Sequence, residues 1–328
     1  MNRFKLILPF IVVLFSFNAI SQDLALTEKT KKIKKTKKTK VKKKKKNAVD
    51  TSVPPSKHFD LSSWSLSVPT DADENGKADQ VYGEQLNTNY SNEYFYASPD
   101  GGMVFKCPID GYKTSKNTTY TRSELREMLR KNDNTIKTKG PNKNNWVLKS
   151  SPNVKTAGGY DGVLKATLAV NHVTTTGDPK HVGRVIIGQI HASDDEPLRI
   201  YYRKLPGSRK GSIYFAHEGR ANGSEDFYEL IGSKDDKDVD PHNGIALNEK
   251  FSYEVQVIDN ILSVSIIRPN KPPVQRAISM ASSGYNIAGE YMYFKAGVYN
   301  QNKTGRPSDY VQATFYKLTN EHKTMSAE

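Results

Sequence analysis

The sequence of 328 residues is poor in cysteine, in long apolar runs and in helical periodicity. Its one cysteine, Cys107, excludes an intrachain disulfide. No apolar run is long enough to span a bilayer comfortably, and no segment has the apolar periodicity of an amphipathic helix of three or more turns. No internal repeat of fixed period is present either. These absences argue against a disulfide-stapled scaffold, a helical bundle and a repeat array, and they leave a globular body that depends on its core.

What the sequence has in abundance is aromatic residues and turn formers, with 18 tyrosines, 12 phenylalanines, 22 glycines and 16 prolines. Between residues 58 and 318, short alternating or apolar runs such as "VLKATLAV", residues 163–170, are separated by turn signals. Asp259 and Asn260 stand between two such runs and predict a tight hairpin. Many short strands at this spacing predict an all-β fold, an antiparallel β-sandwich or β-jelly-roll with one sheet bent into a concave substrate groove.

The first 21 residues are typical of a secretory signal peptide. Arg3 and Lys5 form a basic start, residues 6–17 are apolar, and small residues before Gln22 offer a cleavage site. The alternative is an uncleaved membrane anchor, which is disfavoured because the apolar run is short. We therefore expect a secreted protein, extracellular or periplasmic, with no integral membrane segment after cleavage.

A lysine-rich segment follows the expected cleavage site. Thirteen lysines and no acidic residue lie between Lys29 and Lys46, and they account for most of the net charge of +14. Such a self-repelling segment with little apolar content predicts a disordered linker over residues 22–57. A tether to an anionic surface or polymer is the alternative, whereas nucleic-acid binding is disfavoured because no aromatic residue interleaves the lysines. The folded domain is then expected over residues 58–320, with a C-terminal tail over residues 321–328.

The stretch "YTRSELREMLR", residues 120–130, contains strong helix formers but fits a strand better. As a helix it would set Arg122 four residues from Arg126, which is a mildly unfavourable like-charge pair. As a strand it places Arg122, Glu124 and Arg126 on one face, because side chains alternate with a period of two. In an otherwise all-β body we predict a strand, although a surface charge ladder is the alternative for this segment taken alone.

Two further segments carry polar groups at alternate positions. In "VIIGQIH", residues 185–191, Gln189 and His191 share a face at the end of an apolar strand, although a lone histidine is more often structural. In "YMYFKAGVYNQ", residues 291–301, one side of the predicted strand carries Tyr293, Lys295, Gly297, Tyr299 and Gln301. The glycine is predicted to leave room for a ligand, and ordinary cross-strand packing is the alternative explanation for Tyr293.

Together these positions provide arginine, glutamine, histidine, lysine and tyrosine, with no evident pair of catalytic carboxylates. That set argues against acid/base glycoside hydrolysis, which usually needs two carboxylates. It suits β-elimination of an acidic polysaccharide, in which arginine and glutamine neutralise a uronate carboxylate. A histidine or a deprotonated tyrosine then removes the C5 proton, and a tyrosine hydroxyl protonates the departing oxygen.

Three segments in this order, "RSELREM", "GQIH" and "YFKAGVYNQ", resemble the three signature motifs of the alginate lyases of polysaccharide lyase family seven. The segment "FDLSSWSLSVP", residues 59–69, resembles the opening strand of that family, and the likeness extends to about Leu318. The resemblance implies a β-jelly-roll whose concave groove holds the polymer. The lysine-rich segment lies outside the resemblance.

The resemblance also implies roles for the motif residues. Arg122 and Gln189 would neutralise the carboxylate, His191 would be the base for guluronate, and Tyr299 would be the acid and the base for mannuronate. Four further motif positions would line the groove and bind substrate: Glu124, Arg126, Lys295 and Gln301. Alternation along the last strand adds Tyr293 to this group. Members with isoleucine between the glutamine and the histidine tend to accept guluronate-containing blocks, as Ile190 would here.

We therefore expect a secreted alginate lyase that cleaves the 4-O-glycosidic bond by β-elimination and leaves an unsaturated uronate at the new non-reducing end. It is expected to act as a monomer, without an organic cofactor or a catalytic metal. One alternative is a non-catalytic module that binds acidic polysaccharide, and another is a lyase for a different polyuronate such as glucuronan. A third is a surface-adhesion protein that acts through the lysine-rich segment.

One turn resembles the start of a calcium loop. In "DADENGKADQVY", residues 71–82, four residues fit loop positions one, three, five and six: Asp71, Asp73, Asn75 and Gly76. Position twelve is Tyr82 rather than a bidentate glutamate. A polar surface turn is therefore favoured over a structural calcium site.

Overall fold

The computed structural model describes residues 50–237 and 239–325. The predicted signal peptide, and the predicted linker before residue 50, lie outside the described residues. The carbonyl of Val53 accepts a hydrogen bond from the backbone N–H of Ala97 at 2.8 Å. The buried Pro55 then opens a 3-10 helix, η1 (Pro55–Lys57), because the fixed φ of proline suits a helix start. Ordered structure thus begins before the expected domain boundary at residue 58.

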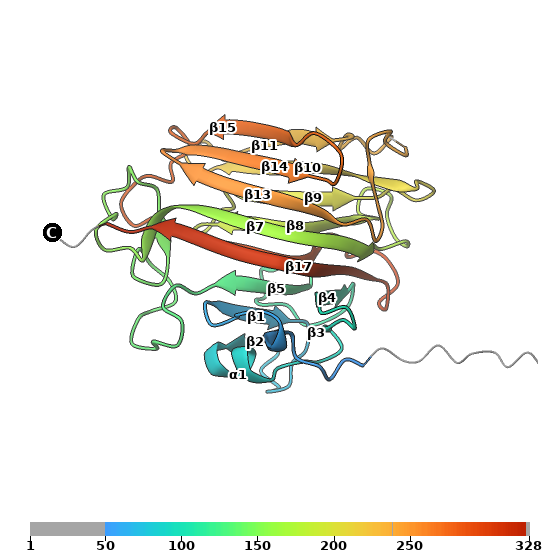
Figure 1. Cartoon of the computed structure of the whole chain (residues 1–328), viewed down its shortest axis with the longest axis horizontal. Coiled ribbons are helices and arrows are strands. Elements are labelled where there is room, and N and C mark those ends of the chain that lie inside the picture. Colours follow the sequence, from blue (N-terminus) through green and yellow to red (C-terminus); the bar gives the residue numbers. More distant parts are fainter. Residues whose placement is uncertain (1–49, 238, 326–328) are drawn as a thin grey trace, which may run out of the picture. The chain divides into compact units, whose positions relative to one another are not determined.

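Two antiparallel sheets make up the fold, which confirms the predicted antiparallel sandwich of the jelly-roll class (Figure 1). The nine-stranded sheet has the order β11 (Ser224–Ile231), β10 (Lys210–Gly219), β9 (Leu198–Arg203), β8 (Arg184–His191), β16 (Tyr293–Asn300), β5 (Arg122–Glu127), β1 (Trp64–Val68) and β2 (Asp79–Tyr82), with β12 (Ile245–Ala246) paired to β10. The eight-stranded sheet has the order β15 (Val274–Ser279), β14 (Ile261–Ile267), β13 (Phe251–Ile258), β7 (Gly159–His172), β17 (Tyr310–Lys323), β4 (Met103–Pro108) and β3 (Phe95–Ala97). The short β6 (Trp146–Val147) pairs with β7 in parallel.

Helical structure is a minor part of the described chain. The α-helix α1 (Gly83–Thr88) follows β2 directly. Among the residues that the structure describes, no helix has the length and apolar content needed to cross a membrane.

The core lies between the sheets and is built from alternate residues of their strands. Leu125 on β5 and Phe294 on β16 are fully buried in one cluster with Phe105 and Phe315 of the eight-stranded sheet. Burying a side chain of this size stabilises the fold by about 1.5–3 kcal/mol. The predicted strand over residues 122–127 is confirmed, because pairing with β1 and β16 on both sides outweighs its helix propensity.

The predicted hairpin at residues 259–260 is also confirmed. Ile258 and Ile261 are directly opposite each other at the ends of β13 and β14. Asp259 and Asn260 both have positive φ, 48° and 64°, as a two-residue turn that follows the twist of its strands requires.

Strand β17 continues to Lys323, beyond the expected domain end at residue 320. The side chain of His322 is buried, and its Nε2 lies 2.8 Å from Oε1 of Glu127 on β5. The same carboxylate accepts a hydrogen bond from the backbone N–H of Phe294 at 3.0 Å. Burial opposes the charge on His322, but Glu127 outweighs it and raises the pKa of the imidazole. This ion pair joins the last strand to the core side of the strands that carry the predicted site.

Candidate active site

A groove with a volume of about 580 Å³ covers part of the outward face of the nine-stranded sheet. Six of the predicted site residues line it: Arg122, Arg126, His191, Tyr293, Lys295 and Tyr299. They come from β5, β8 and β16, and further lining residues lie within the segments 114–119, 138–139 and 193–196. Three segments that are far apart in the sequence therefore meet on one face of the sheet.

The strand register explains this meeting. Lys295 on β16 is directly opposite Arg126 on β5 and directly opposite Gln189 on β8. Tyr293, two residues earlier on β16, is opposite His191. Neighbouring strands are about 4.8 Å apart, so side chains at these positions on one face are within contact distance.

Glu124 lies at the centre of the site, with its side chain fully buried. It forms ion pairs with Arg122, whose Nη1 is 3.1 Å away, and with Lys295, and it accepts a hydrogen bond from the amide of Gln189. Burial opposes ionisation of Glu124, but Lys295 and Arg122 outweigh it and hold the pKa of the carboxyl below its usual value. Two cations share one carboxylate, so the cluster keeps a net positive charge toward the groove.

The two cations respond differently to burial. Burial, followed by repulsion from Arg122, lowers the pKa of Lys295 to about 8, although Glu124 opposes the shift. Burial also disfavours the charge on Arg122, but Glu124 and then Tyr299 outweigh it and raise its pKa. Arg122 is therefore the permanent cation of the pair, and an added anion would favour the charged form of Lys295.

Arg126 is held rigidly at the next position along β5. Its Nη1 donates to the carbonyl of Glu127 at 2.8 Å, and its Nη2 donates to Oδ1 of Asn145 at 2.8 Å. Its Cζ lies 3.9 Å from the centre of the Tyr293 ring, which is a cation–π contact. Asn145 was not predicted, because it lies in a loop with no periodic pattern to indicate its direction.

His191 is arranged as a neutral base. Its Nδ1 lies 2.7 Å from the carbonyl of Ala192, which can only accept, so Nδ1 carries the hydrogen. The lone pair of the neutral ring is then on Nε2. Burial, followed by the positive charge of Lys295, lowers the pKa of His191 to about 3. The ring stacks on Tyr293 with centroids 5.1 Å apart, which fixes its plane.

A carboxylate that was not predicted faces this base. Oε1 of Glu196 lies 3.3 Å from Nε2 of His191, and Glu196 also lines the groove. Burial raises the pKa of Glu196 to about 7, with Arg199 opposing the shift and Glu218 adding to it. A protonated Glu196 donates its hydrogen to Nε2, whereas an ionised Glu196 leaves the lone pair free. The only sequence signal for this carboxylate was the short segment "ASDDEP" after His191. That segment contains three acidic residues, and no pattern shows which of them faces the histidine.

Tyr299 supplies the phenol of the groove. Cζ of Arg122 lies 3.9 Å from the centre of its ring, and Tyr120 contacts the ring edge with centroids 6.0 Å apart. Burial raises the pKa of Tyr299, although Arg122 opposes the shift. The hydroxyl therefore holds its proton at neutral pH and is available as a proton donor.

Two expectations for β16 have a different outcome in the structure. Gly297 has a φ of +141°, and a Cβ there would collide with the Ser123 carbonyl and with Cα of Glu124. The prediction that this glycine makes room for a ligand is therefore wrong, because the neighbouring strand β5 occupies that space. Gln301 follows the end of β16, is buried and donates to the carbonyl of Asn300 at 3.2 Å, so the structure does not bring it into the groove lining.

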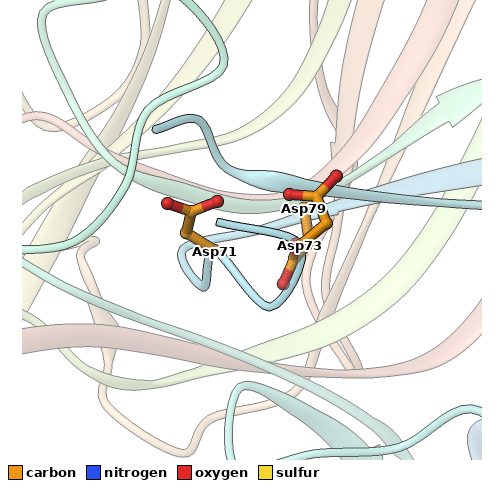
Figure 2. A group of neighbouring side chains, drawn as sticks. All are labelled: Asp71, Asp73 and Asp79. Atoms are coloured by element: carbon orange, nitrogen blue, oxygen red, sulfur yellow. The ribbon is translucent and has the colours of Figure 1, made fainter. Parts of the chain in front are cut away.

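The turn between β1 and β2 brings three carboxylates close together: Asp71, Asp73 and Asp79 (Figure 2). Asp71 accepts hydrogen bonds from the backbone N–H groups of Asn75 and Gly76 at 2.9 and 3.0 Å. Asp79 accepts from the backbone N–H of Ala72 at 3.0 Å. These carboxylates hold the turn together through its own donors, and the acidic cluster alone does not define a metal site.

Comparisons with known proteins agree with this geometry. A family model described as alginate lyase matches residues 59–322. An alginate lyase from Klebsiella pneumoniae is 57% identical over 279 residues, which cover 82% of this chain and 91% of that protein. The crystal structure of the alginate lyase from Klebsiella pneumoniae has a TM-score of 0.81 to this chain at 57% identity, over 82% of this chain and 98% of that chain.

More distant structures share the architecture. An alginate lyase from Pseudomonas aeruginosa is 27% identical with a TM-score of 0.60, over 81% of this chain and 100% of that chain. An exolytic family 7 alginate lyase from Zobellia galactanivorans is 23% identical with a TM-score of 0.62, over 84% of this chain and 99% of that chain, and supports the fold alone. The family match spans most of the sequence and includes every strand of the groove. The chain belongs to the alginate lyases of polysaccharide lyase family seven.

Proposed function

We propose that this alginate lyase works by β-elimination, with Arg122, His191 and Tyr299 acting on one uronate unit in the groove. One observation carries the proposal. An imidazole whose Nδ1 is the donor and a phenol that holds its proton line the same groove as a cluster of net positive charge. A non-catalytic binding surface would need the cations but not this pair of proton-transfer groups.

The positive cluster prepares the substrate. The C5 proton of a uronate becomes acidic only when the neighbouring carboxylate is neutralised by charged donors. Arg122 supplies a permanent charge, and Lys295 adds a second cation beside it. Gln189 is 1% exposed and donates one N–H to Glu124, and we assign its second N–H to the sugar carboxylate when the substrate is bound.

The proton transfers balance as follows. For guluronate, Nε2 of His191 takes the C5 proton, and the electron pair of that C–H bond forms a double bond between C4 and C5. The C4–O bond to the departing sugar breaks, and Tyr299 donates its phenolic proton to the leaving oxygen. The products are a shortened chain and a chain with an unsaturated uronate at its new non-reducing end. For mannuronate, the deprotonated form of Tyr299, which the charge of Arg122 favours, takes the C5 proton and then returns that proton to the leaving oxygen.

We also propose that the protein prefers guluronate-containing blocks. His191 has the arrangement of a neutral base, and Ile190 between Gln189 and His191 is typical of family members that accept such blocks. The apolar Ile190 side chain is fully buried in the core, so it fixes the position of the two polar residues on either side of it.

The test is an incubation with separate polymers. The protein is mixed with polyguluronate, with polymannuronate and with glucuronan, and the ultraviolet absorbance of the unsaturated product is followed. The expected result is a rise with both alginate polymers, faster with polyguluronate. Binding without a rise in absorbance would overturn β-elimination. A rise in absorbance with glucuronan alone would overturn alginate as the substrate.

Export is a separate part of the proposal and is supported by the sequence of residues 1–21. Expression of the full chain in a Gram-negative host, followed by fractionation, tests it. Activity that stays in the cytoplasm with an uncleaved N-terminus would overturn it.

A further inference from the structure

A second cavity opens at the edge of the nine-stranded sheet, beside the groove. It has a volume of about 270 Å³ and lies between the end of β2 and the loop that follows β5, and we call it the edge cavity. Tyr82, the last residue of β2, lines both the edge cavity and the groove. Its side chain is 46% exposed, so core packing does not explain an aromatic residue at this position.

The strand register places Tyr82 in line with the catalytic cluster. Lys295 on β16 is opposite Arg126 on β5. Arg126 is opposite Ser65 on β1, and Ser65 is opposite Tyr82 on β2. Tyr82 is therefore three strand spacings, about 14 Å, from Lys295 along one row. A pyranose unit in a polymer advances by a distance close to one strand spacing, so a chain lying across the strands reaches Tyr82 roughly three sugars away.

On the groove face between Arg126 and Tyr82, β1 contributes only short side chains. Ser65 and Ser67 are the residues that β1 presents to this face. The hydroxyl of Ser67 donates to Oε1 of Gln80 on β2 at 2.8 Å, and both of these residues line the groove. The large Trp64 of β1 lies opposite Glu127 and lines the edge cavity, so no long side chain of β1 on the groove face separates the groove from the edge cavity.

The edge cavity has the chemistry of a site for a sugar acid. Its charged lining residues are Arg130, Lys131 and Glu84, which give it a net positive charge. Asn132 and Asn134 add side-chain amides that can bind hydroxyl groups. An aromatic face, a cation for a carboxylate and a few placed polar groups are what recognition of one uronate unit requires.

The edge cavity is preformed by packing. Nη1 of Arg130 donates to the carbonyls of Asp133 and Ile136 at 3.1 and 2.7 Å, which fixes the guanidinium in the loop. Its Nε is buried and has no hydrogen-bond partner among the described residues. Gly83 has a φ of +48°, and a Cβ there would collide with Oδ1 of Asn132, so the loop packs directly against the end of β2.

We propose that the edge cavity is a distal subsite of the groove, which binds one uronate unit of the alginate chain. The sugar ring lies against Tyr82, and its carboxylate binds Arg130 and Lys131. This inference rests on the proposed function, since its ligand is a remote unit of the polymer that the groove cleaves.

Substrate length provides the test. Values of kcat/KM are measured on alginate oligomers of increasing length for the wild type, Tyr82→Ala and Tyr82→Phe. Tyr112→Ala is the matched control, because Tyr112 is 48% exposed and lines neither cavity. Tyr82→Ala should lower kcat/KM about tenfold on oligomers long enough to reach the edge cavity, through KM, and leave the shortest cleaved oligomer unchanged. Tyr82→Phe keeps the ring and should retain wild-type values.

A charge variant tests the second half of the subsite. Lys131→Gln should lower kcat/KM about threefold on the long oligomers only, and it should weaken the dependence of KM on salt. Equal losses on all lengths, or no loss in Tyr82→Ala on the longest oligomers, would overturn the subsite. Thermal unfolding of each variant shows whether a uniform loss comes from misfolding, and Tyr82→Phe then decides whether the ring matters.

Failure of the proposed function would be visible separately, since the wild type would then cleave no oligomer. Calorimetric binding of long and short oligomers would still test the subsite in that case. Weaker binding of only the long oligomers to Tyr82→Ala would support it, and equal binding of all lengths to the wild type and the variant would overturn it.

Discussion

Two buried glutamates on one strand, Glu124 and Glu127 of β5, serve opposite faces of the same sheet. Glu124 is on the groove side, where it holds Arg122 and Lys295. Glu127 is on the core side, where it holds His322. Both carboxylates are fully buried, and in both the partners outweigh the effect of burial and lower the pKa.

The two glutamates differ in whether a ligand can reach the side chains that pair with them. The cations that pair with Glu124 line the groove and can also bind a substrate anion. The imidazole that pairs with Glu127 packs against Trp146 and Phe294, with ring centroids 5.2 and 5.3 Å apart, and does not line the groove. A buried ion pair is therefore not itself a sign of function, because what matters is whether its partners are open to a ligand. Changes on the groove side should reduce turnover, and changes on the core side should reduce stability.

The largest expected effect is on the groove side. Tyr299→Phe removes one hydroxyl and keeps the ring under Arg122, so the free energy of unfolding should change by less than about 0.5 kcal/mol. Loss of the acid should lower kcat on alginate by about 1,000-fold while oligomer binding persists. Absorbance assays and calorimetry measure the two quantities. Unchanged turnover would remove Tyr299 from the mechanism and weaken the contrast between the two faces.

On the core side, Glu127→Gln leaves His322 buried without its counter-charge. The free energy of unfolding should fall by about 3 kcal/mol, while kcat of the folded protein stays within about twofold. Glu321→Gln, on an exposed neighbour in β17, is the matched control and should be nearly neutral. Denaturant unfolding and kinetics at saturating substrate check both values. A large loss of kcat with normal stability would contradict the division between the faces.

The same ion pair predicts a pH dependence of stability. Because the folded pKa of His322 is raised, its contribution is fully present below the unfolded value of about 6.5 and is lost as the pH rises through the folded pKa. The folded pKa of Glu127 is lowered, so its contribution is present above the unfolded value of about 4.3 and is lost as the pH falls through the folded pKa. The difference in Tm between the wild type and Glu127→Gln should therefore be greatest from weakly acidic to neutral pH. A difference that grows steadily at alkaline pH would rule this account out.

His191→Asn should have a smaller effect that depends on the polymer. Asparagine keeps a polar side chain at the site but cannot take a proton, so cleavage of polyguluronate should fall about 100-fold. Cleavage of polymannuronate should fall much less, because Tyr299 serves as its base in the proposed mechanism. Initial rates on the two pure polymers decide the matter. Equal losses on both would refute the assignment of separate bases.

The sequence predicts the groove face well because alternation along a strand is a local property. Arg122, Lys295 and Tyr299 could be placed on one side of their strands without any knowledge of the partners. The strand pairing that brings β5, β8 and β16 together is not local, and here the family resemblance supplied what periodicity could not. The prediction that Gly297 leaves room for a ligand is wrong for this reason, since alternation along β16 does not show that β5 packs against this glycine.

Residues that act through loops or distant contacts were not predicted. His322 lies 195 positions from Glu127 and was assigned to a tail, because the sequence shows no amphipathic pattern there that demands burial. Asn145 and Glu196 lie in loops, whose side-chain directions depend on turns rather than on a period. Glu196 is the most informative of these omissions, since it faces the atom that the mechanism requires to be free.

The smallest expected effect comes from that carboxylate. With a pKa of about 7, Glu196 is protonated in weak acid, where its hydrogen occupies Nε2 of His191, and ionised in weak base, where Nε2 is free. The groups that face it include Arg199, Glu218 and Lys295. The rate on polyguluronate should therefore rise as the pH increases through about 7.

In Glu196→Gln an amide N–H occupies Nε2 of His191 at every pH. The rate of this variant on polyguluronate should therefore not change with pH near 7, and above neutrality it should be about threefold lower than the wild-type rate. Polymannuronate, whose base is Tyr299, serves as the internal control, and an unchanged polyguluronate profile in this variant would show that Glu196 does not govern the base.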